Sequence, residues 1–144
     1  MQIKSKQIEQ KVFISRDGME FSTAVECRRH EVVQTFLKCK CHTVNSMGEP
    51  KYIVNCATLD DLRDVLEFFD NTYSTNAFSS NFNEEDVQSL VPGRIVFEYL
   101  ENDMFEQGLI YSIDRLITEI DNKIVALKHL KQTLTREENK DVIR

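Results

Sequence analysis

The chain has 144 residues, of which 41% are hydrophobic and 29% are charged. This composition fits one globular domain that is large enough to bury a core without disulfide or metal staples. Its net charge of −6 opposes general binding to nucleic acid, because phosphate backbones require a basic surface. The N-terminus lacks the apolar run of a signal peptide, and no segment is as apolar as a membrane helix. We therefore expect a cytoplasmic protein.

The chain opens with the pattern of a β-hairpin. Residues 11–15 carry the β-branched and aromatic side chains of a strand, and residues 19–21 form a short returning segment. Between them lies Asp17-Gly18, a pair that tolerates the positive φ angles of a tight two-residue turn. The sequence predicts a hairpin closed by these two residues.

Two capped helices and two further strands are predicted next. Thr23 and Glu26 have the spacing of a capping box, which opens a helix that runs to about Lys38. Thr58 is placed to cap a second helix, whose apolar residues recur at helical spacing. Between the helices, residues 39–45 and 52–56 are typical of strands.

Residues 70–83 are polar and show no periodicity, so they predict a long loop. Three aromatic residues in this loop, Tyr73, Phe78 and Phe82, have two interpretations: they pin the loop to the body, or they contact a partner. Three carboxylates follow the loop and belong to an acidic middle region: Glu84, Glu85 and Asp86. We take them as candidate contacts to a partner. The alternative is a solvated helix start, where acidic side chains are favoured.

The C-terminal part carries a heptad pattern after a strand predicted at residues 94–100. Isoleucine and leucine fill the a and d positions over more than three heptads, with Lys131 as a polar break. The seam residues are Ile110, Ile113, Ile117, Ile120, Ile124, Leu127 and Leu134. We expect this helix to join copies of the chain, either as dimers or as trimers. The alternative is that it packs on its own domain.

The element order predicts an α+β fold with a small antiparallel or mixed sheet and helices on one face. We place an α+β domain at residues 1–104, a coiled-coil-like helix at 105–137 and a polar tail at 138–144.

The stretch from Phe13 to Glu31 resembles the opening of many small uncharacterised bacteriophage proteins. The shared features are a strand, the Asp17-Gly18 turn, a Glu-Phe pair, a Ser/Thr cap and a Glu-Cys helix start. The resemblance covers about twenty residues. It implies a phage accessory gene, a class that often encodes inhibitors of bacterial host or defence proteins.

Metal and catalytic sites find little support in the sequence. Four cysteines and two neighbouring histidines are possible zinc ligands: Cys27, His30, Cys39, Cys41, His42 and Cys56. If the first helix is continuous, it separates Cys27 from Cys39 by about 18 Å, too far for one ion. No nucleophile–base pair and no phosphate-binding glycine loop is present. We predict no enzyme, no metal and no cofactor.

Our first hypothesis is an oligomeric protein that binds and inhibits a bacterial host or defence protein without catalysis. The alternative is a protein that sequesters an anionic nucleotide signal through Arg28, Arg29 and His30, assisted by the basic N-terminal segment with Lys4 and Lys6.

Overall fold

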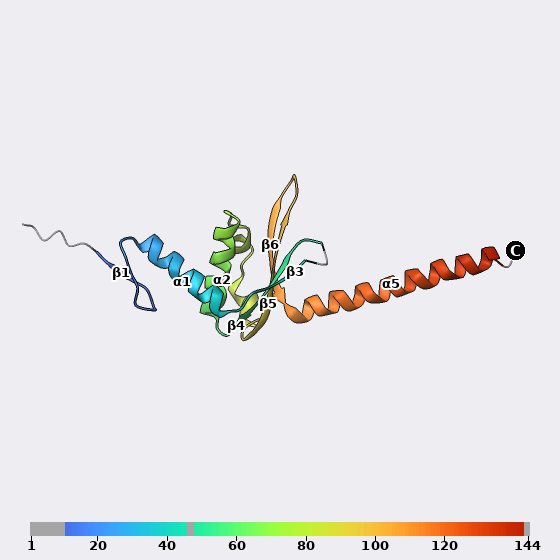
Figure 1. Ribbon diagram of the computed structural model, residues 1–144, viewed down its shortest axis with the longest axis horizontal. Coiled ribbons are helices and arrows are strands. Elements are labelled where there is room, and N and C mark those ends of the chain that lie inside the picture. The colour runs from blue at the N-terminus through green and yellow to red at the C-terminus, as the bar shows by residue number, and fades with distance from the viewer. Residues whose placement is uncertain (1–10, 46–47, 143–144) are drawn as a thin grey trace, which may run out of the picture.

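The computed structural model describes residues 11–45 and 48–142 and has an α+β fold (Figure 1). A four-stranded antiparallel sheet has the order β3-β4-β5-β6, and β1 and β2 form a separate hairpin. The strands are β1 (Phe13–Ile14), β2 (Glu20–Phe21), β3 (His42–Val44), β4 (Lys51–Cys56), β5 (Gly93–Glu101) and β6 (Glu106–Ser112). The helices are α1 (Ala24–Lys38), α2 (Leu59–Thr72), α3 (Ala77–Ser80), α4 (Glu84–Gln88) and α5 (Ile113–Val142). The predicted fold class is confirmed. Among the described residues, none of the helices combines the length and the apolar character that a membrane span requires.

The N-terminal hairpin forms as predicted, but with a different turn. Phe13 pairs with Phe21, and the amide of Ser15 donates to the carbonyl of Met19 at 2.9 Å. The loop therefore spans residues 16–18 rather than 17–18. Gly18 closes it with a φ of +86°, in the left-handed region that glycine adopts without strain.

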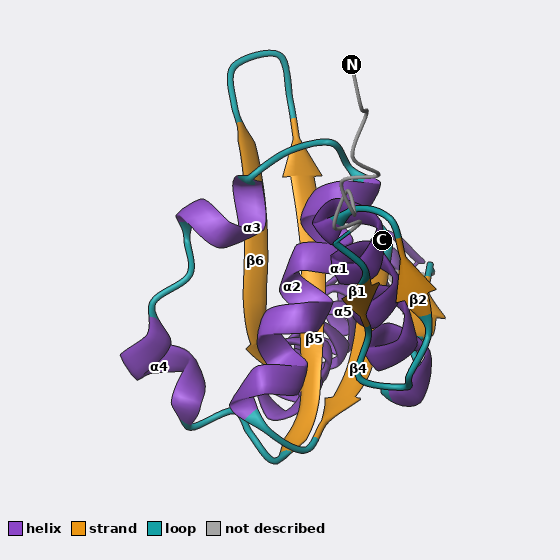
Figure 2. Ribbon diagram, turned by 90° about the vertical axis from the view of Figure 1, so that its left-hand side faces the viewer, coloured by secondary structure: helices purple, strands orange, loops and turns teal. Residues whose placement is uncertain are grey.

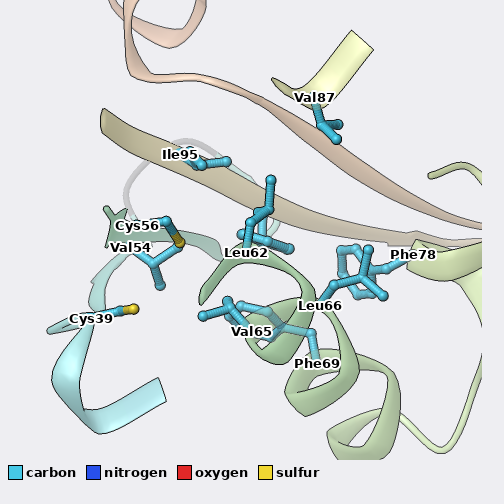
Figure 3. Packing of buried hydrophobic residues seen from close by; sticks show 11 residues of the cluster. Cys39, Val54, Cys56, Leu62, Val65, Leu66, Phe69, Phe78, Val87 and Ile95 are labelled. Carbon is cyan, nitrogen blue, oxygen red and sulfur yellow. The ribbon is translucent and has the colours of Figure 1, made fainter. Parts of the chain in front are cut away.

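Helices α1 and α2 begin at the predicted caps. The side chain of Thr23 accepts a hydrogen bond from the amide of Glu26 at 3.2 Å, and Thr58 accepts from the amide of Asp61 at 3.1 Å. The main core lies between α2 and one face of the large sheet (Figure 3), with Cys39 at the end of α1, Phe78 of α3 and Val87 of α4 at its edges. Its buried members are Cys39, Val54, Cys56, Leu62, Val65, Leu66, Phe69, Phe78, Val87, Ile95 and Phe97.

The sheet buries side chains on both faces. Along β5, Ile95 and Phe97 point into the main core, while Val96 between them points to the opposite face, as strand alternation requires. There Val96 packs with Tyr111 and Leu116 in a second, smaller cluster. The first turns of α5 are thus held against the back of the sheet.

The C-terminal helix does not begin at residue 105, so this part of the prediction is wrong. Residues Glu106–Ser112 form β6, which pairs along its whole length with β5 and places Ile110 opposite Phe97. A turn precedes it, in which the side chain of Asn102 accepts hydrogen bonds from the amides of Met104 and Phe105 at 2.8 and 3.0 Å. Ladder hydrogen bonds and core burial by Ile110 outweigh the heptad spacing of this segment.

The same helix also ends later than predicted, at Val142 instead of residue 137. The expected polar tail contains no glycine or proline, and its glutamate and lysine residues favour helix. Nothing in this part of the sequence therefore ends the helix.

Candidate functional site

Helix α5 leaves the body of the protein and points away from all other elements (Figure 1). We call residues 121–137 the arm, and the described residues from 11 to 120 the head. Every side chain of the arm is exposed. Among the large apolar ones, Ile124 is 43% exposed, Leu127 65% and Leu134 57%. A helix of this length with an uncovered apolar seam is the most prominent candidate site of the molecule.

The predicted oligomerisation residues therefore fall into three groups. Ile110 belongs to β6 and packs on the main core. Ile113 and Ile120 pack against the second cluster on the back of the sheet. The other four are exposed on α5: Ile117, Ile124, Leu127 and Leu134. Ile117, which is 45% exposed, lies in the part of α5 that belongs to the head. The interpretation that the helix packs on its own domain thus holds for its first turns. Oligomerisation through the exposed residues stays a prediction.

Charged residues border the exposed seam. Asp121 and Lys128 occupy the e positions of successive heptads, and Lys123 occupies a g position. In the part of the chain that the structure describes, none of these three forms an ion pair. Their charges are available to a partner that lies along the seam.

A second exposed apolar feature is the tip of the β5–β6 hairpin, which projects beyond the rest of the sheet (Figure 2). Met104 is 92% exposed and Phe105 is 53% exposed. The Asn102 turn fixes the backbone on which both side chains stand. Sequence reasoning missed this site because it assigned Phe105 to a helix; the signal was the Asn102-Asp103 pair between two apolar segments.

The predicted loop at residues 70–83 is partly helical, because α2 runs on to Thr72 and α3 covers Ala77–Ser80. The carboxylate of Asp70 accepts hydrogen bonds from the amides of Phe78 and Ser79 at 3.1 and 3.3 Å, which orients α3. Phe78 is fully buried, and Tyr73 and Phe82 are half-buried against the main core. These aromatics pin the segment to the body, and Phe78 offers no surface to a partner.

The acidic run lies on the surface of α4. Glu84, Glu85 and Asp86 are all exposed, and the side chain of Asn83 caps the helix through the amide of Glu85 at 3.0 Å. Arg63 of α2 contacts Glu84. A role of these carboxylates in partner binding stays a prediction.

Two of the three residues of the alternative ligand site contact carboxylates of the chain itself. Arg28 donates to Glu67 at 2.9 Å and to Asp64 at 2.7 Å. His30 lies 2.7 Å from the carboxylate of Asp17. Both side chains therefore already hold anions of the chain itself.

Asp64 is the centre of this ionic cluster. Burial works against its charge, but hydrogen bonds from Thr35 at 2.7 Å, from Arg28 and from Arg16 at 2.9 Å hold its pKa below the usual value. The cluster ties the N-terminal hairpin loop and α1 to α2. It is a structural joint between elements.

Of the three candidate ligand residues, Arg29 lines an open groove of about 810 Å³ beside Val33 and Phe68. Two carboxylates, Asp70 and Glu106, line the same groove and oppose the binding of an anion. The nucleotide-sequestering alternative stays a prediction that rests on Arg29. Lys4 and Lys6 lie outside the described residues.

The cysteines do not converge on a metal site. Cys27, Cys39 and Cys56 are buried and Cys41 is half-buried, all as free thiols. Burial raises the pKa of the Cys41 thiol, which disfavours the reactive thiolate. Across residues 11–45 and 48–142, no group of three or more His, Cys, Asp or Glu side chains is placed to hold a metal ion.

Comparison with known proteins finds no match among family models, curated proteins or solved structures. The functional assignment therefore rests on the geometry of the arm and the head.

Proposed function

We propose that this chain is an interaction protein that assembles through its arm and binds another protein through its head. The observation that carries the proposal is the uncovered seam of the arm. Most of the stability of a helix in a protein comes from packing of its apolar face, and every side chain of the arm is exposed. Pairing with other helices would cover its isoleucine and leucine residues and stabilise the helix.

The head supplies two surfaces that suit a protein partner. Met104 and Phe105 present apolar side chains at the end of a projecting hairpin, and exposed apolar groups of this kind anchor protein interfaces. The carboxylates of α4 add negative charge on the same head. The partner class is a bacterial host or defence protein, inhibited by binding alone. This part of the proposal rests on the N-terminal resemblance to phage accessory proteins.

Light scattering on a matched pair of variants tests the assembly. Ile124→Asp combined with Leu127→Asp places two charges in the seam. Val125→Asp combined with Ala126→Asp places the same charges on the same turn but outside the seam. We expect the native chain and the Val125/Ala126 variant to be oligomers, and the Ile124/Leu127 variant to be a monomer with an unchanged head.

A native chain that is monomeric at high concentration would contradict the proposal. So would equal dissociation by both variants, because charge alone would then explain the effect.

The partner surface is tested with Met104→Ser combined with Phe105→Ser. We expect this variant to keep the stability and the assembly of the native chain, and to lose a bacterial protein that the native chain retains in affinity capture. Equal capture of that protein by both chains would exclude the hairpin tip as the binding surface.

A further inference from the structure

We infer that two chains pair through α5 in antiparallel orientation, with Ile124 of one chain opposite the partner's Leu127. This inference rests on the proposed assembly and specifies its partner as a second copy of the same chain. It is carried by the unpaired charges beside the seam, and it determines where the two heads lie.

Parallel pairing would bring like charges together. In a parallel coiled coil, a g residue faces the e residue of the next heptad on the other helix. Lys123 would then face the partner's Lys128, on both sides of the dimer. At an a position, Lys131 would in addition face its own copy across the seam.

Antiparallel pairing removes each of these conflicts. Residues at e then face e, and residues at g face g. With Ile124 opposite the partner's Leu127, Asp121 faces the partner's Lys128, and the symmetry repeats this pair. Lys123 faces the partner's Leu130, whose apolar surface its aliphatic stem can cover. Lys131 faces the partner's Ile120 in place of another lysine.

The charges also select the register. A shift by one heptad in one direction sets Asp121 against the partner's Asp121, and a shift in the other direction sets Lys128 against the partner's Lys128. The inferred register avoids both. It pairs the four exposed seam residues with one another, because Ile117 then lies opposite the partner's Leu134 while Ile124 lies opposite the partner's Leu127.

The consequence is a two-headed molecule. Because α5 points directly away from the head (Figure 1), antiparallel pairing places the two heads at opposite ends of a shared rod. The end of each helix then lies beside the first turns of the partner's α5. Two hairpin tips held apart in this way suit two binding sites on one extended partner or on two partners.

Charge reversal at Lys128 distinguishes the two orientations, because it should raise the dimer Kd of an antiparallel pair and lower that of a parallel pair. In the antiparallel dimer, Lys128→Glu turns two attractive pairs into repulsive ones, and we expect the dimer Kd to rise about tenfold in sedimentation equilibrium at low salt. The double variant Asp121→Lys/Lys128→Glu restores both pairs, so its Kd returns to within about twofold of the native value. Arg136→Glu makes the same charge change at an outward position and leaves the Kd unchanged.

In a parallel dimer, Lys128→Glu would relieve the contact with Lys123 and lower the Kd. A lowered or unchanged Kd would overturn the antiparallel inference and leave the assembly intact. A native monomer would overturn the proposed assembly itself, and a trimer would overturn the two-stranded arrangement.

A distance measurement gives an independent readout. Spin labels at position 136, attached through a non-cysteine residue, should lie about 32 Å apart along the rod in the inferred register. In a parallel dimer they would lie side by side at the same end, separated only by the width of the helix pair. A distance distribution centred on this width would overturn the inference.

Discussion

The head and the arm differ in whether their charged residues have ion-pair partners. In the head, Asp64 is surrounded by three hydrogen-bond donors, and Lys51 is buried with Glu98 at 2.8 Å. In the arm, Asp121 and Lys128 stand beside exposed isoleucine and leucine without an ion-pair partner among the described residues.

This difference predicts that the residues that fold the head are distinct from those that would join two chains. The head buries four aromatic side chains, Phe69, Phe78, Phe97 and Tyr111. Within the described part of the chain, no buried side-chain nitrogen or oxygen lacks a hydrogen-bond partner. The stability of the head therefore comes from its own core and its own hydrogen bonds. The arm leaves its apolar surface in water, where burial by a partner would contribute about 25 cal/mol per Å². In the proposed dimer, the free energy of association would therefore come from the exposed part of α5.

The comparison predicts its largest effect at Phe78. Phe78→Ala removes a fully buried ring from the main core and should lower the free energy of unfolding by about 3–5 kcal/mol. Urea denaturation followed by near-UV circular dichroism measures the change. Phe105→Ala is the matched control, because it removes the same side chain from an exposed site; its effect should stay within about 0.5 kcal/mol.

If the head and the arm are independent, Phe78→Ala should leave the dimer Kd unchanged under conditions in which the head stays folded. A loss of assembly in the folded variant would show that the two regions are coupled.

A smaller effect is predicted for the ionic cluster. Asp64→Asn removes the charge that Arg28 and Arg16 contact and should cost about 3 kcal/mol of stability at neutral pH. The pKa of Asp64 is lower in the folded chain than its usual value of 3.8. The carboxylate therefore stabilises the fold above that pH, and the contribution is lost as the pH falls through the folded pKa.

The gap in unfolding free energy between the native chain and Asp64→Asn should thus be wide at neutral pH and narrow below about pH 3.8. Asp86→Asn, at an exposed position of α4, is the control and should show no such gap. A gap that stays constant down to acidic pH would contradict the role of the Asp64 charge.

Local signals predicted much of the head. Thr23 and Thr58 cap their helices because a hydroxyl close to a free amide needs no tertiary context. The hairpin at Gly18 follows from backbone freedom in the same way. These features depend on residues that are adjacent in the sequence.

The errors occurred where distant residues decide. Ile110 fits the heptad pattern, but its pairing with Phe97 of β5 makes it part of a strand. Gly108 allows this strand to pass close to α3, since an added Cβ would lie 2.6 Å from the ring of Phe78. Single-sequence periodicity contains no information on such a contact. The hairpin tip with Met104 and Phe105 differs, because the Asn102-Asp103 pair signals its turn locally and the heptad spacing was followed instead.

The smallest perturbation, simple dilution, tests the comparison between head and arm most directly. All four tyrosines, Tyr52, Tyr73, Tyr99 and Tyr111, lie in the head, so near-UV circular dichroism reports on the head alone. Far-UV circular dichroism reports on helix in both regions.

Below the dimer Kd, the arm loses its partner and, as an isolated helix, should partly unfold. We expect far-UV helicity to fall with dilution while the near-UV signal per chain stays constant. The Ile124→Asp/Leu127→Asp variant should show the reduced helicity at every concentration. Helicity that is independent of concentration in the native chain, across a range in which light scattering shows dissociation, would mean that the arm is stable alone and that association is not what folds it.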